Sequence, residues 1–212
     1  MSKAKAPELT FSSNRTPTNS NKSSKDSCEL FYFCGGQSLL CRGGRPSCWA
    51  GCPSKEVLSR IAELELDSFD EGGYWTAPQL REVLTEGAST VSVVLVDKRI
   101  VGFAMFRSVP PEGELIRLAV DSRYKRKGYG HLLLHDGLEM LIEKGIEEVF
   151  LEVAENNNPA ISLYSSFGFV EAGRRKNYYP HLSKDGLVMK KDLSEWPISK
   201  HRKEADSGAR DV

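Results

Sequence analysis

The chain has 212 residues, 40% of them hydrophobic, and it balances 29 Lys and Arg against 29 Asp and Glu. That length suits one domain with a hydrophobic core and is marginal for two. Residues 54–193 carry 18 basic against 22 acidic side chains, and a net-acidic domain has no general attraction for phosphate backbones, so we expect no direct binding of nucleic acid.

Residues 1–53 are predicted to form a leader of low order. Residues 1–27 are rich in Ser, Asn, Thr and Lys, and such a composition cannot bury enough apolar surface to offset the entropy of ordering. Few acids and many serines also resemble an organelle transit peptide, and an upstream translated extension would have the same composition. We expect a cytoplasmic protein, or an organellar one if the leader is a transit peptide. The segment 37–46, QSLLCRGGRP, could hold a short first strand with a turn at Gly43 and Gly44.

The cysteines are confined to the leader. They have no C-x-x-C spacing and no histidine among them, so neither a zinc site nor a disulfide framework is supported, and we expect no metal. The five cysteines are Cys28, Cys34, Cys41, Cys48 and Cys52.

No apolar run approaches the ~18 residues that a membrane-spanning helix requires, so we expect no membrane partner.

From residue 54 the pattern predicts two helices and then three strands. The first helix has Ser54 as its N-cap and places Val57, Ile61, Leu64 and Phe69 near helical spacing. The second helix begins at Thr76 and stops at Gly87. The strands come from an apolar hairpin with a turn at Asp97-Lys98. In chain order the ranges are 54–69, 76–87, the hairpin 90–109 and a strand at 114–121.

The second half of the domain alternates helices and strands. A helix at 129–144 has Leu134, Leu138, Leu141 and Ile142 on one face, and a short helix at 158–168 stops at Gly168. Strands are predicted at 147–154, 169–175 and 187–193, and residues 194–212 form a polar tail. We predict a single mixed α/β domain over residues 54–193, with a helix after each of two central strands.

Between the strand at 114–121 and the next helix lies the basic loop SRYKRKGYG. A glycine-rich turn into a helix presents unpaired N–H groups and the positive helix end to an anion. The loop has neither G-x-G-x-x-G nor G-x-x-x-x-G-K-[ST] spacing. Its K-R-K-G-Y-G run resembles the pyrophosphate-binding loop of the GNAT superfamily, [QR]-x-x-G-x-[GA], with Lys125 at the first position. The alternative is a glycine-containing helix start with a solvated basic face.

The segments that follow favour the first interpretation. FLEVAENNNPAISLYSSFGF, RRKNYYP and LVM come in the order and near the distances found in the ribosomal-protein alanine N-acetyltransferases of that superfamily. The resemblance covers roughly residues 55–193 and is strongest over 115–180. It implies a GNAT-like mixed sheet flanked by helices, acetyl-CoA as co-substrate, and the N-terminal amine of a ribosomal protein, with alanine first, as acceptor. We expect a monomer.

The resemblance also implies the residues that hold acetyl-CoA. The backbone of the strand at 118–120 would bind the pantetheine arm as an added strand, the basic loop would bind the pyrophosphate, and an asparagine before the short helix would complete the site. These residues are Leu118, Ala119, Val120, Arg126, Lys127, Gly128, Tyr129, Gly130, His131 and Asn157.

Residues 54–193 contain no cysteine and no G-x-S-x-G motif, so direct attack of the amine on the thioester in a ternary complex is the simpler route. That route needs a base and an acid. Glu152 stands in an apolar strand, on the face of Phe150 and Ala154. It could pair with a neighbouring Arg, or, as the resemblance implies, act as the general base.

Tyr164 lies on the short helix between Ile161 and Phe167 and could be a core aromatic. The resemblance implies a proton donor, and an ordinary tyrosine pKa of ~10 suits protonation of a thiolate. Trp75, Tyr178 and Tyr179 are candidate walls of a peptide groove, with packing as the alternative. Two competing functions stay open at this stage: acetylation of lysine or a small-molecule amine, and acyl-CoA binding without catalysis.

Overall fold

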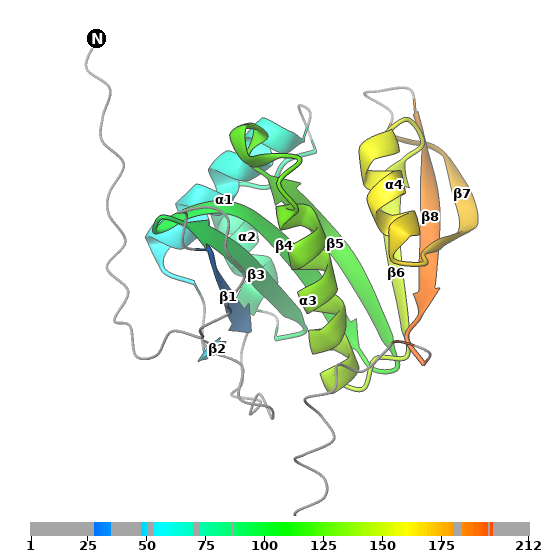
Figure 1. The fold of residues 1–212 in the computed structure, drawn as a ribbon, viewed down its shortest axis with the longest axis horizontal. Helices are drawn as coiled ribbons and strands as arrows, with labels where there is room; N and C mark the ends of the chain where they lie inside the picture. The colour runs from blue at the N-terminus through cyan, green and yellow to red at the C-terminus, as the bar shows by residue number, and fades with distance from the viewer. Residues whose placement is uncertain are drawn as a thin grey trace, which may run out of the picture.

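The computed structural model describes residues 28–34, 48–50, 53–69, 73–85, 87–179, 184–194 and 196. These residues form one sheet with helices on both faces (Figure 1). The strands are β1 Cys28–Cys34, β2 Cys48–Ala50, β3 Ser89–Val96, β4 Arg99–Val109, β5 Glu112–Val120, β6 Glu148–Ala154, β7 Val170–Tyr179 and β8 Lys184–Asp192. The helices are α1 Lys55–Ser68, α2 Ala77–Thr85, α3 Tyr129–Glu143 and α4 Asn158–Ser166, with a 3-10 turn at Ser122–Tyr124.

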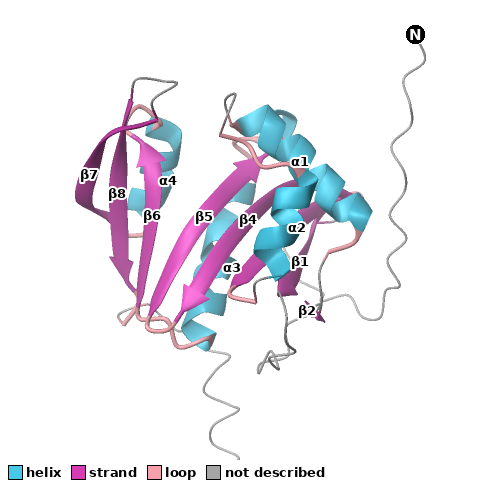
Figure 2. Cartoon of the chain, turned by 180° about the vertical axis from the view of Figure 1, so that it is seen from behind, coloured by secondary structure: helices cyan, strands magenta, loops and turns pink. Residues whose placement is uncertain are grey.

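The sheet is mixed, with strand order β2-β1-β3-β4-β5-β6-β8-β7. The pairs β5–β6 and β1–β2 are parallel and the other neighbours are antiparallel. The crossover from β5 to β6 passes through α3, as a parallel pair requires. Figure 2 shows α1 and α2 over one face of β3, β4 and β5, while α3 and α4 lie on the other face.

Two hydrophobic clusters fill the two sides of the sheet. One joins α1 and α2 to β3 and β4, with Ile61, Leu80 and Phe103 at its centre. The other joins α3 and α4 to β4, β5, β6 and β8 and includes Leu138 and Leu151. Among the described residues, no helix has the length and apolar character needed to cross a membrane.

Most of the predicted elements are confirmed. The Ser54 side chain accepts a hydrogen bond from Val57 N as the N-cap of α1, and the hairpin turns at Asp97 and Lys98, both with positive φ. β7 is longer than predicted, and Phe69 lies outside α1 as its C-cap.

The leader contributes two strands, β1 and the short β2, that the sequence interpretation did not find. β1 pairs along its length with β3, from Cys28 opposite Val96 to Cys34 opposite Thr90. The strand suggested within 37–46 lies outside the described residues. The division of the chain at residues 53 and 193 stays a prediction.

Replacing Gly137 of α3 by Ala is expected to destabilise the domain by roughly 1–3 kcal/mol, the usual cost of overpacking a core. A Cβ at this position would overlap the ring of Phe106 on β4. The clash outweighs the gain of up to ~1 kcal/mol from removing a helical glycine. Urea unfolding measures the change. The matched control is Gly173→Ala on β7, where an added Cβ meets no atom within 4 Å; an equal loss in both variants would contradict the packing argument.

Candidate active site at the divergence of β5 and β6

The two central parallel strands pair over only part of their length. Their ladder runs from Glu112 opposite Glu148 to Leu115 opposite Leu151 and then stops. One extra residue of β5, Ile116, interrupts the register with β4 and forms a β-bulge. A bulge bends its strand, and beyond it β5 stays paired with β4 but turns away from β6, as Figures 1 and 2 show.

The divergence leaves a backbone edge inside the sheet. Residues 117–120 of β5 pair with β4 on one side, and residues 152–154 of β6 pair with β8 on the other. Among the described strand pairings, none joins these two segments to each other. Edges of this kind bind an extended chain by adding it as a strand.

The basic loop and the start of α3 meet this edge. Gly128 is the N-cap of α3, has φ of 87°, and has no side chain with which to cap the helix. Gly130 packs against β5 and α4, because a Cβ there would lie 3.5 Å from Leu163 Cδ2 and 3.7 Å from Leu118 Cδ2. The positive end of the α3 helix dipole therefore faces the part of β5 that diverges from β6.

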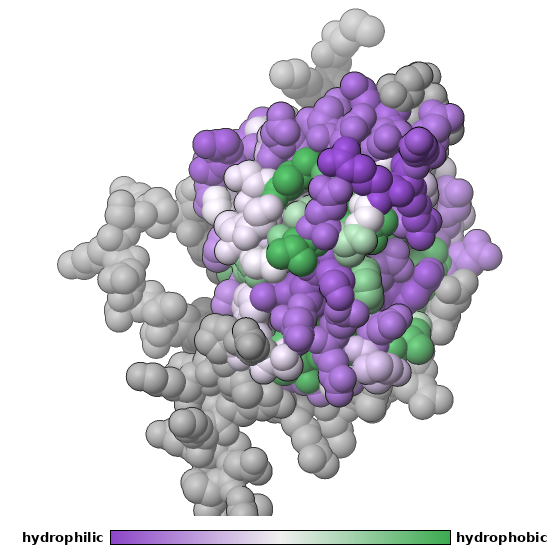
Figure 3. Space-filling model, turned by 90° about the vertical axis from the view of Figure 1, so that its right-hand side faces the viewer, coloured by the Kyte–Doolittle hydropathy of each residue, from purple (hydrophilic) through white to green (hydrophobic). Residues whose placement is uncertain are grey.

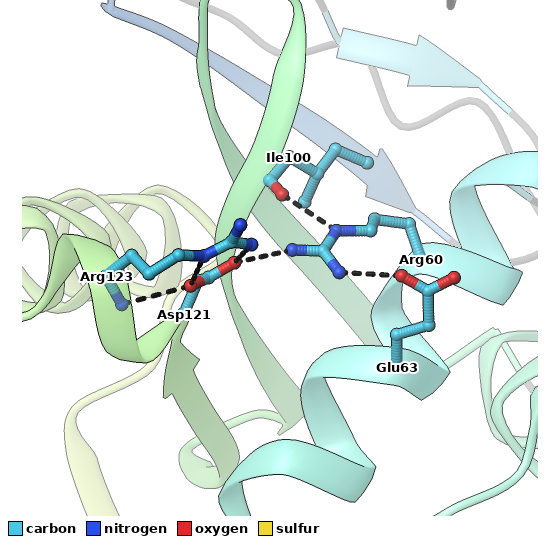
Figure 4. Close-up of polar contacts among 5 residues, drawn as sticks. All are labelled: Arg60, Glu63, Ile100, Asp121 and Arg123. Carbon is cyan, nitrogen blue, oxygen red and sulfur yellow. Dashed lines mark hydrogen bonds and ion pairs between the residues drawn. The ribbon is translucent and has the colours of Figure 1, made fainter. Parts of the chain in front are cut away.

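Asp121 anchors the loop where β5 ends (Figure 4). Its side chain is 3% exposed and lies between two guanidinium groups: Arg60 Nη2 of α1 donates at 2.8 Å and Arg123 Nη2 at 2.6 Å. Arg60 Nε also donates to the Ile100 carbonyl at 3.1 Å. The hydrogen bonds from Arg123, with those from Arg60, hold the pKa of Asp121 far below its usual range.

This network separates Arg123 from the other basic side chains of the loop SRYKRKGYG. Arg123 is engaged by Asp121, whereas Lys125, Arg126 and Lys127 are exposed on the loop that leads to Gly128. Among the described residues of this loop, the three cations that follow the 3-10 turn are therefore the ones not paired with Asp121. Arg126 adopts a φ of 63°, which places a non-glycine residue in the left-handed region at this turn.

Glu152 lies on the face of β6 that the alternation predicted. Its neighbours Leu151 and Val153 are buried in the α3–α4 side of the core, and the Glu152 side chain is 20% exposed on the opposite face. Its Oε1 lies 3.1 Å from Arg175 Nε of β7, across β8. The pairing with a neighbouring Arg is thus present, and the carboxylate is held at the end of β6 that leaves β5.

Tyr164 lies on the other side of β6. The residue is 8% exposed and belongs to the core cluster that includes Val153 and Phe169. Its carbonyl accepts hydrogen bonds from Phe167 N and Phe169 N, which end α4. Its role as proton donor stays a prediction; its position as a core aromatic is shown.

The aromatic candidates for the peptide groove differ in their surroundings. Trp75 is half-buried against the α1–α2 core, with the Arg117 guanidinium 4.4 Å from its ring centroid. Tyr178 is 42% exposed and carries Arg175 over its ring at 5.4 Å. The Tyr179 side chain lies outside the described residues. Figure 3 shows that the face over β7 and β8 is mainly hydrophilic, in keeping with the exposed Arg174, Arg175 and Lys176.

The profile of the Acetyltransferase (GNAT) family matches residues 58–169, more than half of the chain. The chain belongs to the GNAT acetyltransferase family. Ribosomal protein bS18-alanine N-acetyltransferases are relatives. The Salmonella typhimurium protein is 38% identical over 100 residues, 46% of this chain and 68% of that one. The Escherichia coli protein is 38% identical over 98 residues, 45% of this chain and 66% of that one. The matched segments thus span about two thirds of both relatives.

Solved GNAT structures agree with this assignment. The crystal structure of the ribosomal-protein-S18-alanine N-acetyltransferase from Escherichia coli is 27% identical, with a TM-score of 0.60, covering 70% of this chain and 95% of that one. Ard1 from Thermoplasma volcanium is 26% identical, with a TM-score of 0.61, covering 68% of this chain and 96% of that one. The protein is a GNAT acetyl-CoA-dependent N-acetyltransferase, and the predicted fold class is confirmed.

The GNAT co-substrate fits the site described above. Acetyl-CoA combines an extended pantetheine arm with a pyrophosphate. Residues 117–120 offer an unpaired strand edge to the first, and the uncapped N-terminus of α3 offers N–H groups to the second. A Cβ at Gly128 would meet no atom within 4 Å, so the space beside the loop backbone is open.

Two further predicted GNAT cofactor residues have structural contacts of their own. Asn157 is the N-cap of α4, and its Oδ1 accepts a hydrogen bond from Ala160 N at 3.3 Å. His131, in the first turn of α3, packs its ring 4.5 Å from that of Phe167. Among the described residues, no group of three or more potential ligand side chains gathers into a metal site.

Sequence reasoning missed one ion pair next to a predicted site residue, Trp75. Glu65 of α1 and Arg117 of β5 form a buried ion pair beside Trp75. The signal was present, because Glu65 falls beside Leu64 and four residues after Ile61, on the apolar face of the helix. A carboxylate at such a position requires a partner.

Proposed function

We propose that this protein acetylates the N-terminal α-amine of another protein, and that its acceptor is a ribosomal protein with alanine first. The observation that carries the proposal is the 38% identity with relatives named for ribosomal protein bS18-alanine acetylation. The alignment with a solved enzyme of that name over 95% of its length supports the same acceptor. RRKNYYP, residues 174–180, also favours this acceptor over lysine.

The proposed roles combine the family resemblance with the positions of these residues in the structure. Acetyl-CoA supplies an acetyl thioester to the acceptor amine. Residues 118–120 bind its extended arm, and the loop 126–131 binds its pyrophosphate through backbone N–H groups and cations. Glu152 takes the proton from the amine, directly or through a water, on one side of the sheet. Tyr164 supplies a proton to the leaving thiolate from the other side. Trp75 and Tyr178 line the path of the acceptor.

Replacing Gly128 by Val is expected to weaken acetyl-CoA binding at least tenfold, a loss of about 1.4 kcal/mol or more. The variant places a branched side chain in the open space beside the loop and disfavours the φ of 87°. Isothermal titration calorimetry on the folded variant measures the affinity. The matched control is Gly145→Val, which has a φ of 80° and equally open surroundings at the far end of α3. Equal affinities for Gly128→Val and wild type would overturn the assignment of the loop.

The proposed acceptor is tested with a panel of peptides. Each peptide has a free N-terminus with Ala, Ser, Met or Gly first, and a second set has a blocked N-terminus and an internal lysine. Mass spectrometry of the products identifies the acetylated nitrogen. We expect α-acetylation of the Ala peptides, with ribosomal-protein sequences preferred.

The competing functions predict other products. Acetylation of the blocked peptides would show a lysine acetyltransferase. Acetyl-CoA binding without any acetylated peptide would favour a small-molecule amine as the acceptor. Either result would reject the proposed acceptor.

A further inference from the structure

The buried face of α1 contains one carboxylate. Glu65 is 0% exposed and packs among Val57, Leu58, Ile61 and Leu64. Burial raises the pKa of its carboxyl group above the usual value, because a charge in an apolar region loses its hydration. An apolar residue would complete this face of the helix, so the carboxylate needs a reason other than packing.

The contacts of Glu65 reach the segment between α1 and α2. Trp75 N donates a hydrogen bond to Oε2 at 3.0 Å, and Arg117 Nε lies 3.5 Å from the same oxygen. The second oxygen, Oε1, is buried and has no hydrogen-bond partner among the described residues. Glu65 is thus directed at Trp75 and Arg117, and its buried acceptor without a partner among the described residues requires an explanation.

Arg117, the partner of Glu65, also hydrogen-bonds to two backbone carbonyls. Its Nη1 donates to the carbonyl of Ile116, the bulge residue of β5, and its Nη2 donates to the carbonyl of Gly73, each at 3.1 Å. The guanidinium lies 4.4 Å from the Trp75 ring centroid and 5.0 Å from that of Phe69. One side chain therefore joins the backbone before α2, two aromatic rings and the point where β5 turns away from β6.

The location connects this pair to both substrates. Arg117 immediately precedes residues 118–120, the proposed binding edge for the acetyl-CoA arm, and Trp75 is the proposed wall of the acceptor path. We propose that Glu65 and Arg117 are positioning residues that fix Trp75 beside the acyl donor, and so set the affinity for the acceptor peptide. This inference rests on the proposed function, since it assigns Trp75 to the acceptor.

The test uses Glu65→Gln in the full chain. Gln keeps the size and an acceptor for Trp75 N but removes the charge that faces Arg117. We expect KM for the acceptor peptide to rise about tenfold, with the acetyl-CoA Kd within about twofold of wild type. The matched control is Glu56→Gln, an exposed residue in the first turn of the same helix, and it should keep both values.

A double-mutant cycle separates positioning from a general structural role. If Glu65 acts through Trp75, then Glu65→Gln adds less than about twofold to KM in a Trp75→Leu background, because the effects of coupled residues are not additive. An unchanged KM in Glu65→Gln, an equal loss of acetyl-CoA affinity, or an additive effect in the cycle would each overturn the inference. If Glu65→Gln does not fold, Arg117→Gln carries the same comparison. A wild-type protein that acetylates no N-terminal peptide would instead reject the proposed function.

Discussion

Glu152→Gln is expected to lower kcat/KM for the acceptor peptide by about 10²-fold or more, since loss of a general base removes a contribution of that size. The amide keeps the size of the side chain and remains within reach of Arg175, which lies 3.1 Å from Oε1 in the native protein. It cannot take a proton from an ammonium group. Steady-state kinetics at saturating acetyl-CoA, with the acceptor peptide varied, measures the loss of kcat/KM.

The pH profile of this variant identifies both the base and its substrate. At high pH the amine is already neutral and needs no base, so part of the lost activity should return. An N-terminal amine with a pKa of ~8 shows that recovery well below the pH that a lysine with a pKa of ~10.4 requires. Recovery only near the higher value would point to a lysine acceptor.

A carboxylate on the same strand serves as the control. Glu148 lies on the same face of β6, four residues earlier, and pairs with Lys190 at 2.7 Å much as Glu152 pairs with Arg175. Glu148→Gln removes an ion pair of the same kind but lies at the end where β5 and β6 are still paired. It should keep wild-type kcat/KM. Equal losses in both variants would show that the ion pairs, and not the base, carry the effect.

Local patterns in the sequence predicted the elements whose causes are local. Ser54 caps α1, Asp97 and Lys98 turn the hairpin, and strict alternation along β6 places Glu152 opposite the buried Leu151 and Val153. Each of these features depends on residues within a few positions of one another, so periodicity and capping rules suffice.

The features that the sequence did not predict depend on contacts between residues far apart in the chain. Glu152 meets Arg175 only because β8 inserts between β6 and β7, and Glu65 meets Arg117 only because α1 packs beside β5. β1 was missed for a related reason: its seven residues, CELFYFC, follow the polar residues 1–27, whose composition predicts low order, and they become a strand by pairing with β3. Whether such a segment forms a strand depends on the neighbouring strand against which it packs, and not on its own composition alone.

Tyr164→Phe is expected to lower kcat by about 10²-fold, a typical contribution of a positioned acid, and to leave the acetyl-CoA Kd near the wild-type value. The substitution removes one hydroxyl from a residue that is 8% exposed, and the aromatic ring keeps its packing against Phe169, whose centroid lies 6.0 Å away. Calorimetry gives the affinity, and urea unfolding checks that the loss of a buried hydroxyl costs only about 1 kcal/mol.

The two catalytic variants should differ in their response to pH. The proton lost in Tyr164→Phe belongs to the thiolate, so a neutral amine does not replace it, and the activity should show no recovery at high pH. Tyr124→Phe is the control, because Tyr124 is half-buried against the same core cluster and has no proposed role in proton transfer. Recovery at high pH in Tyr164→Phe would assign its proton to the amine side. Near-wild-type turnover in both Tyr164→Phe and Glu152→Gln would reject this acid–base pair and leave substrate positioning at the divergence of β5 and β6 as the source of catalysis.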